Sequence, residues 1–316
     1  MIRISVFIVS YNQEQYIAQA IESVINQNVL PYEVIISDDC STDDTWNIIQ
    51  RYADKYPQLI KANRNNPNLG IFENFNLATR KTSGNLITCV AGDDYIEPGY
   101  FNAVEEFIKE NDLDPDNDSF ILIPNIINLY ENGYQAKYDN LPFKDKNILK
   151  LRLRGLIDDR YGIVSRKSLD STGDFITGIG IHSDFVWGID RYLHTDKVCF
   201  MGGYYSVYRQ GVGVVSRTRE EEASKSLIKA THIVLEKFEL RFDKRDLSFL
   251  HYLEKKNEYL LEKSFSNYCS IAKHTILNIG NFGLLRKEMK ALAFILLPNK
   301  IKKVLFKVKY IKDLSK

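Results

Sequence analysis

The first hundred residues alternate between short apolar runs and longer amphipathic segments, and this alternation limits the possible folds. Consecutive apolar residues are typical of strands buried on both faces. Residues 6–9 are a continuous apolar run, and further strands are expected at 34–36, 59–62 and 86–90. Helical segments are expected between them, at residues 16–25, 43–56 and 72–80. Strand and helix in this order imply right-handed crossovers, so we expect an α/β domain with a mostly parallel sheet flanked by helices.

Polar residues follow three of these strands at the point where each ends. Ser10, Tyr11 and Asn12 follow the first strand, Asp38-Asp39 the second, and Asp93-Asp94 the fourth. The carboxyl ends of parallel strands share one edge, where open α/β folds bind their ligands. The sequence therefore predicts that these three clusters meet in one crevice.

The second half of the chain has a different pattern. Residues 115–215 are mixed, with further strands expected at 121–123 and 198–200. Helical patterns follow, near residues 219–240, 248–275 and 283–297. We therefore predict an α/β domain over residues 1–215 and a helical region over residues 216–316.

Composition excludes several classes of protein. The 316 residues are 44% hydrophobic and 26% charged, as in a globular protein, and a net charge of +1 gives no reason to expect a nucleic-acid partner. Four scattered cysteines form neither a zinc pattern nor a disulfide framework. Met1 leads directly into an apolar strand, and the apolar stretch at 291–297 is too short to span a bilayer. We expect a cytoplasmic protein.

The acidic pair Asp93-Asp94 has two interpretations. Two carboxylates after a buried strand are costly without a positive partner, and Mg²⁺ or Mn²⁺ bridging them to a diphosphate would supply one. A Gly-Asp-Asp turn is the alternative. Asp39 also has two interpretations. It accepts hydrogen bonds from a nucleobase or ribose, or it is a solvated acid of the loop.

These residues together resemble the family 2 glycosyltransferases of the GT-A fold, which have a Rossmann-like sheet. The resemblance rests on Val9-Ser10-Tyr11-Asn12, on the loop 33–45 with its Asp38-Asp39-Cys40-Ser41-Thr42, on Asn76, and on Gly92-Asp93-Asp94-Tyr95. These motifs cover about the first hundred residues, and a weaker match continues to His182-Ser183-Asp184.

The resemblance implies roles for particular residues. Val9, Tyr11, Asp39, Asn76 and Asp93 would bind the nucleotide-sugar donor. Asp93 and Asp94 would hold the divalent metal, and Asp184 would be the general base. The family usually has an acid where Ala91 stands, a glycine at Cys40, an arginine at Phe75 and an acid at Ser183, which puts donor identity and metal affinity in question.

A single candidate base is what a glycosyltransferase needs, whereas a glycosidase needs two carboxylates. A glycosidase needs two carboxylates around the sugar bond, whereas a nucleotide-sugar already carries a good leaving group, so that one base suffices. Direct attack would invert the anomeric carbon, and by resemblance the donor is a UDP-sugar and the acceptor a saccharide. One alternative is a sugar nucleotidyltransferase, although this sequence lacks the basic loop that such an enzyme would need after its first strand. The other is an inactive sugar-nucleotide-binding or scaffold subunit. A helix cap is the alternative role for Asp184.

The last residues carry a signal of their own. One helical face over 301–311 is apolar, and lysines crowd the rest of residues 300–312. Such a helix suits the surface of an anionic membrane, or it docks on the protein body with its lysines in water. Membrane attachment would place the protein at the inner face of the membrane and would fit a lipid-linked saccharide acceptor in the synthesis of cell-surface polysaccharide.

Overall fold

The computed structural model describes residues 1–144 and 146–262. The chain divides into two compact units, Met1–Lys237 and Phe238–Lys316. The first unit carries the sheet, and the described part of the second contains a 3₁₀ turn, η2 (Glu239–Arg241), and helix α10 (Lys244–Leu261). The predicted helix 283–297 and the basic tail lie outside the described residues. The predicted domain boundary after residue 215 stays a prediction.

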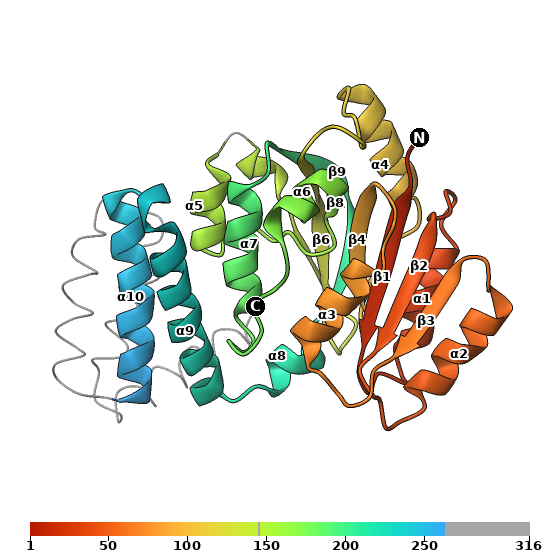
Figure 1. Cartoon of the computed structure of the whole chain (residues 1–316), viewed down its shortest axis with the longest axis horizontal. Helices are drawn as coiled ribbons and strands as arrows, with labels where there is room; N and C mark the ends of the chain where they lie inside the picture. Colours follow the sequence, from red (N-terminus) through yellow and green to blue (C-terminus); the bar gives the residue numbers. More distant parts are fainter. Residues whose placement is uncertain (145, 263–316) are drawn as a thin grey trace, which may run out of the picture. The chain divides into compact units, whose positions relative to one another are not determined.

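The four predicted strands form one parallel half of the sheet. They are β1 (Ile4–Ser10), β2 (Glu33–Asp38), β3 (Ile60–Arg64) and β4 (Leu86–Ala91), in the order β3-β2-β1-β4. The connecting helices are α1 (Ile17–Ile25), α2 (Thr45–Lys55) and α3 (Ile71–Arg80). This half of the fold, in red to orange in Figure 1, confirms the pattern read from the sequence.

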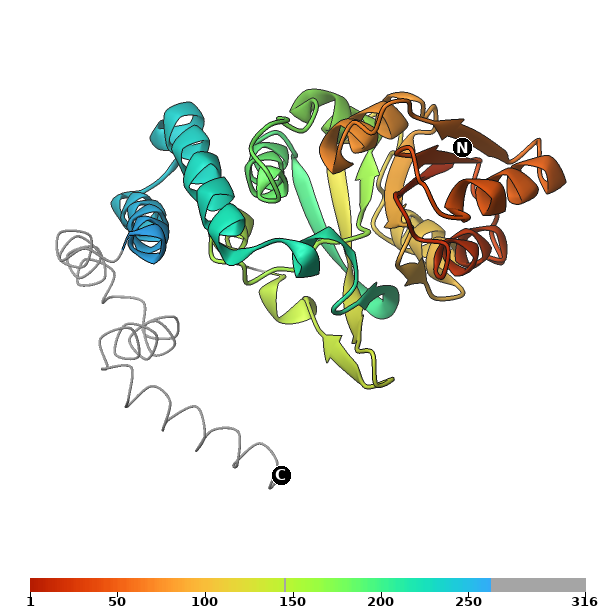
Figure 2. The same cartoon turned by 90° about the horizontal axis from the view of Figure 1, so that it is seen from below.

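The other half of the sheet is mixed. After β4 the order continues β8-β6-β9-β5, and β7 pairs with β6. These strands are β5 (Tyr95–Ile96), β6 (Phe120–Leu129), β7 (Gln135–Tyr138), β8 (Ile163–Ser165) and β9 (Lys197–Arg209). β6 and β9 are parallel, whereas β8 is antiparallel to both β4 and β6. The β6–β7 hairpin extends away from the rest of its unit (Figure 2).

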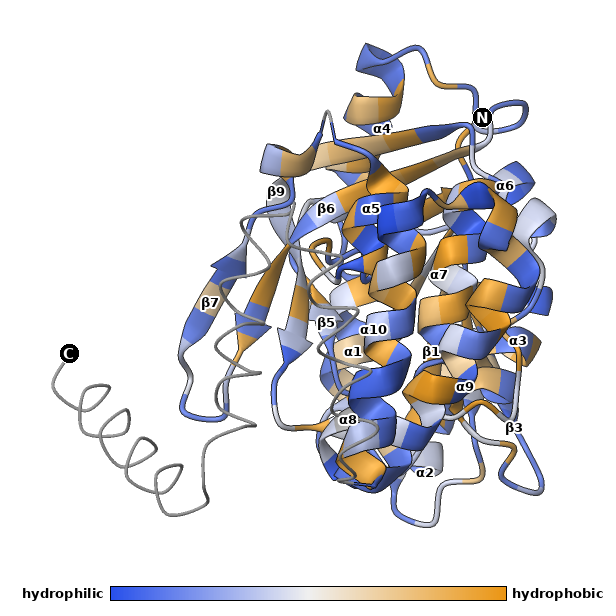
Figure 3. Ribbon diagram, turned by 90° about the vertical axis from the view of Figure 1, so that its left-hand side faces the viewer, coloured by the Kyte–Doolittle hydropathy of each residue, from blue (hydrophilic) through white to orange (hydrophobic). Residues whose placement is uncertain are grey.

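Helices cover both faces of the sheet. The remaining ones are α4 (Tyr100–Glu110), η1 (Leu141–Phe143), α5 (Ile148–Leu153), α6 (Arg166–Thr172), α7 (Ser183–Leu193), α8 (Gly213–Arg217) and α9 (Glu220–Phe238). Helices α7 and α9 carry hydrophobic and hydrophilic residues side by side, as surface helices do (Figure 3).

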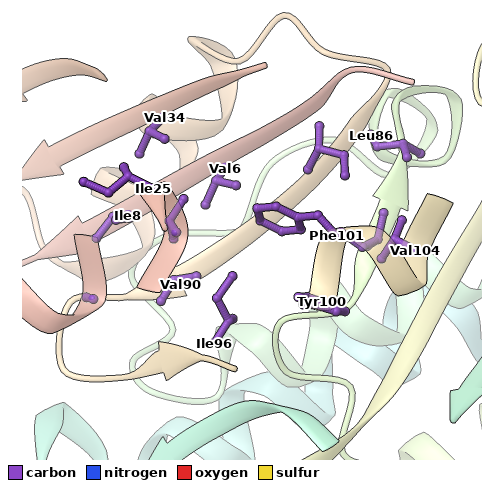
Figure 4. Packing of buried hydrophobic residues seen from close by; sticks show 14 of the residues in the cluster. Val6, Ile8, Ile25, Val34, Leu86, Val90, Ile96, Tyr100, Phe101 and Val104 are labelled. Atoms are coloured by element: carbon purple, nitrogen blue, oxygen red, sulfur yellow. The ribbon is translucent and has the colours of Figure 1, made fainter. Parts of the chain in front are cut away.

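The core consists of two apolar layers that follow the alternation of side chains along the strands. Val6 and Ile8 of β1 point toward α1 and α4, where they pack with Phe101 and Val104 (Figure 4). Phe7, between them in sequence, points to the opposite face, where α3, α5, α6 and α7 pack. Two-sided burial explains why these strands read as continuous apolar runs. No helix in the described ranges is long and apolar enough to cross a bilayer.

Candidate functional site

One pocket lies where β1, β2 and β4 end, and we call it the Asp93 pocket. It has a volume of about 310 Å³. Val9, Tyr11, Asp39 and Asp93 all line it, which confirms that the three polar clusters converge at one edge of the sheet. Residues 68–74 form another part of its wall, and the segment after β9 adds residues 212–214 and Arg217.

The loops after β1 and β2 are tied to each other at the mouth of this pocket. The Asn12 amide N–H donates to Ser41 Oγ at 2.9 Å, and the Thr42 amide N–H donates to Asn12 Oδ1 at 2.8 Å. Asn12 and Cys40 both have positive φ, 52° and 64°. These bonds fix the backbone around Tyr11, a residue that is 45% exposed and lines the pocket.

Asp39 is a buried acid that binds the loop at residues 65–70. Its Oδ1 accepts from Asn65 Nδ2 at 3.0 Å and from the Leu69 amide at 2.9 Å, and its Oδ2 accepts from the Gly70 amide at 2.8 Å. A carboxylate has about four acceptor positions. Asp39 therefore holds the 65–70 loop and has about one acceptor position left.

Asp93 and Asp94 are neighbours with different surroundings. The carboxylate of Asp93 lines the pocket and points toward Gly213, where an added Cβ would lie only 2.6 Å from its Oδ2. Burial raises the pKa of Asp93, and the guanidinium groups of Arg209 and Arg217 act in the opposite direction. Asp93 is therefore a buried acid beside two cations, at the surface of an open pocket.

Both carboxylate oxygens of Asp94 are already engaged. Oδ1 accepts from the Arg209 amide at 2.7 Å, and Oδ2 accepts from the hydroxyl of Tyr161. Burial, and then the charge of Asp93, raise the pKa of Asp94 to about 7. Asp94 thus ties β4 to the end of β9 and to Tyr161. Its role as a metal ligand stays a prediction.

Arg209 fastens the Asp93-Asp94 turn from the other side. Its Nη1 donates to the Asp93 carbonyl, and its Nη2 donates to Gln19 Oε1. The guanidinium also lies over the rings of Tyr16 and Tyr95, 4.9 and 5.0 Å from the centroids. The last residues of β9 therefore place the following segment, with Gly213 and Arg217, against Asp93.

A second, larger cavity of about 530 Å³ lies beside the turn, and we call it the Asp184 cavity. Its apolar wall includes Phe75, Phe175 and Trp187, and the Phe175 and Trp187 rings stack at 4.4 Å. Tyr161, which binds Asp94, also lines it. The cavity therefore borders the same turn from which Asp93 faces the first pocket.

Asp184 lies in the first turn of α7, with its side chain 57% exposed. The helix begins after His182, whose side chain makes no capping hydrogen bond, and Asp184 is not the capping residue either. The predicted alternative, a helix cap, therefore does not describe Asp184. Its carboxylate lies 3.6 Å from Arg152 Nη2.

Asn76 is not brought to the Asp93 pocket. Its Nδ2 donates to the Phe175 carbonyl at 3.0 Å, and its Oδ1 accepts from the Phe175 amide at 2.9 Å. Both ends of the amide are used to hold the backbone beside the stacked aromatic rings. The donor-binding role that the resemblance suggested for Asn76 therefore has no support in its contacts.

Sequence reasoning missed Arg217, Arg209 and Tyr161. Each reaches the acidic turn from a segment distant in sequence, and no local motif marks any of them. The nearest sequence signal is the pair of glycines, Gly211 and Gly213, four residues or more before Arg217.

The Asp93 pocket suits a hard divalent cation that also binds a ligand. In residues 1–144 and 146–262, no three His, Cys, Asp or Glu side chains gather into a metal site. Gln13 also lines the pocket, and its buried Oε1 has no hydrogen-bond partner among the described residues. Mg²⁺ and Mn²⁺ bind through one or two protein oxygens together with phosphates and water. Asp93, whose carboxylate lines the pocket, fits that donor set, whereas the Gln13 Oε1 lies against Gly92.

Comparison with known proteins gives one family. Residues 5–173 match the model of glycosyl transferase family 2. A chondroitin synthase of Escherichia coli is 28% identical over 207 residues, which are 62% of this chain and 28% of that protein. The chain spans about a third or less of the length of the curated relatives it matches.

Solved structures share the fold. The crystal structure of TarS residues 1–349 from S. aureus, in complex with UDP-GlcNAc, has a TM-score of 0.65 at 20% identity and covers 86% of this chain and 79% of that one. The mannosyltransferase PcManGT from Pyrobaculum calidifontis, in complex with GDP-Man and Mn²⁺, has a TM-score of 0.57 at 15% identity and covers 92% of this chain and 84% of that one.

Proposed function

Because the chain belongs to glycosyl transferase family 2 and is a glycosyltransferase of the GT-A fold, we propose that it transfers a sugar from a nucleotide-sugar to an acceptor hydroxyl with inversion. The observation that carries this proposal is the meeting of Tyr11, Asp39 and Asp93 in one pocket. The strand ends that bring them together are where α/β sheets bind nucleotides.

The nucleoside binds between Tyr11 and Asp39. The half-exposed ring of Tyr11 offers a stacking surface for the base, and Asp39 accepts a hydrogen bond from a base N–H or a ribose hydroxyl. A UDP-sugar is the proposed donor. The UDP-GlcNAc complex of the structurally similar TarS supports this choice.

The diphosphate binds between Asp93 and Arg217. A divalent metal held by Asp93 would neutralise charge on the departing diphosphate. Arg217 faces the same pocket and is close enough to Asp93 to influence its pKa. Arg217 therefore supplies a second positive charge at the leaving group. The site has one carboxylate fewer than is usual, because Ala91 stands where the family often has an acid.

Asp184 acts as the general base on the acceptor. Its exposed carboxylate lines the cavity next to the Asp93-Asp94 turn. It takes the proton of the acceptor hydroxyl as the oxygen bonds to the anomeric carbon and the bond from that carbon to the diphosphate oxygen breaks. One base is enough, because the diphosphate leaves without protonation by a second carboxyl group.

The acceptor is proposed to be a saccharide in the synthesis of a cell-surface polysaccharide. The names of the matched relatives, chondroitin synthase and a poly(ribitol-phosphate) N-acetylglucosaminyltransferase, support this context. A cytoplasmic location at the inner face of the membrane and a lipid-linked acceptor remain part of the proposal. Both depend on the basic tail at 300–312, outside the described residues.

The test is release of nucleoside diphosphate from a panel of UDP-, GDP- and TDP-sugars, with Mn²⁺ or with EDTA. We expect slow hydrolysis of one donor, lost in EDTA and lowered by about 100-fold or more in Asp93→Ala, because one transition-state contact is worth that much. Absence of both turnover and donor binding, with acceptor saccharides present, would rule out the transferase.

The inactive subunit is the second candidate, and Ser183 is the observation that favours it. Ser183 stands where the family usually has an acid, and its hydroxyl donates to the Ile176 carbonyl, a structural role. The same panel separates the two candidates, since an inactive subunit would bind one donor without releasing the diphosphate.

A further inference from the structure

We propose that Arg152 is a positioning residue for Asp184, and that the lack of a side chain at Gly188 allows the Arg152 guanidinium to reach Asp184. This inference rests on the proposed function, in which Asp184 is the base. Arg152 belongs to α5, and its guanidinium crosses to α7. There Nη2 donates to the Asp184 carbonyl at 2.9 Å and lies 3.6 Å from Asp184 Oδ2.

Gly188 makes room for this guanidinium. It lies one helical turn after Asp184, on the same face of α7. A Cβ at this position would lie 2.6 Å from Arg152 Nε and 2.8 Å from Nη2, closer than real Cβ contacts come. Glycine is a poor residue for a helix interior, so its presence here calls for a packing reason. The close approach of Arg152 is that reason.

The other end of the guanidinium is anchored in a buried cluster. Arg152 Nη1 lies 3.2 Å from Asp159 Oδ1, while Asp159 Oδ2 accepts from Arg191 Nη2 at 2.5 Å and from the Tyr192 hydroxyl at 2.7 Å. Asp159 is 8% exposed and Arg152 16% exposed. Two arginines and two aspartates balance in charge, and a planar guanidinium with both ends bound cannot rotate freely.

Among the described residues, the ion pair with Arg152 is the contact that reaches the Asp184 carboxylate. Its side chain is more than half exposed, and the residue before α7, His182, provides no side-chain cap. The first turn of a helix has unsatisfied backbone groups and frays when no cap is present. The Ser183 hydroxyl and the His182 amide bind neighbouring segments. The contact with Arg152 adds to them at Asp184 itself, on its carbonyl and its carboxylate.

Two variants test this arrangement. Arg152→Gln removes the contact but also unbalances Asp159. Gly188→Ala keeps Arg152 and favours the helix, yet displaces the guanidinium from α7. The matched control is Gly202→Ala in β9, where an added Cβ would meet nothing within 4 Å. Donor kcat and KM, donor binding by calorimetry and amide hydrogen exchange in the first turn of α7 are measured for all three.

We expect kcat to fall by roughly 10- to 100-fold in both test variants, because small displacements of a catalytic group cost that much. Donor KM and binding should stay near wild type, and exchange at the start of α7 should accelerate. Unchanged kcat in the folded variants, or unchanged exchange, would overturn the inference. If wild type itself turns over no donor, the proposed function fails, and the exchange rates alone decide whether Arg152 positions Asp184.

Discussion

Cys40 shows at the scale of one residue how this chain departs from its family. It stands in the loop after β2 with φ of 64°, a conformation that glycine adopts freely and other residues adopt at a cost. The sequence showed that a glycine is usual there, and the backbone gives the reason. The loop must turn sharply after Asp39 so that the Ser41 hydroxyl can accept from the Asn12 amide.

Replacing Cys40 by glycine should therefore relieve strain. We expect Cys40→Gly to raise the free energy of unfolding by about 0.5 to 1 kcal/mol, since relief of the left-handed φ exceeds the added entropy of the unfolded chain. Urea unfolding measures this. Cys40→Ala keeps the strained φ and is the control; an equal gain in both variants would show that the thiol, and not the backbone, is responsible.

The division of roles between Asp93 and Asp94 could not be read from the sequence. Two adjacent acids look equivalent there, and their surroundings come from β9 and Tyr161, more than sixty positions away. The sequence predicted the pocket correctly because strand ends share one edge. Which carboxylate faces the pocket depends on contacts between distant segments.

At the scale of elements, buried strands were predictable and short mixed ones were not. β1 and β2 contain continuous apolar runs because both of their faces are covered. β8 has three residues and β5 two, and their pairing partners come from distant segments. Such strands lack a periodic signal of their own, so the antiparallel pairing beyond β4 had to come from the structure.

Glu33 links several elements at the start of β2. It accepts from Ser5 of β1, from Ser83 before β4, and from Lys61 of β3 at 2.8 Å. Burial raises its pKa, but these hydrogen bonds outweigh burial and lower the pKa of Glu33 to about 2. Its carboxylate therefore favours the folded state when ionised.

The sign of the pH dependence follows from this lowered pKa. The contribution of Glu33 is present above its unfolded pKa of about 4.5 and is lost as pH falls toward 2. We expect Glu33→Gln to cost about 2 kcal/mol at neutral pH, in the range for hydrogen bonds to a charged group. The difference from wild type should shrink below pH 4. Unfolding curves from pH 3 to pH 7 measure it, and a constant difference would contradict this account.

At the scale of the whole molecule, both pockets belong to the first compact unit. Every residue lining the Asp93 pocket and the Asp184 cavity lies before residue 218. Helix α9 belongs largely to the same unit, and its Ser226 hydroxyl accepts from the His182 amide at 3.0 Å, just before Asp184. We therefore propose that the catalytic domain extends to about residue 237, beyond the boundary at 215 that the sequence suggested.

The central claim is that a nucleotide-sugar binds in the Asp93 pocket with a metal at Asp93. Calorimetric titration of the full chain with UDP-sugars, with and without Mn²⁺, tests it most directly. Wild type should bind one donor in the presence of Mn²⁺, and Asp93→Asn should lose about 10-fold or more in affinity, equal to the loss of a charged contact. Asp116→Asn, a half-exposed acid remote from the pocket in the fold, should bind as wild type. Equal binding by wild type and Asp93→Asn, or dependence on neither Mn²⁺ nor Asp93, would contradict the claim.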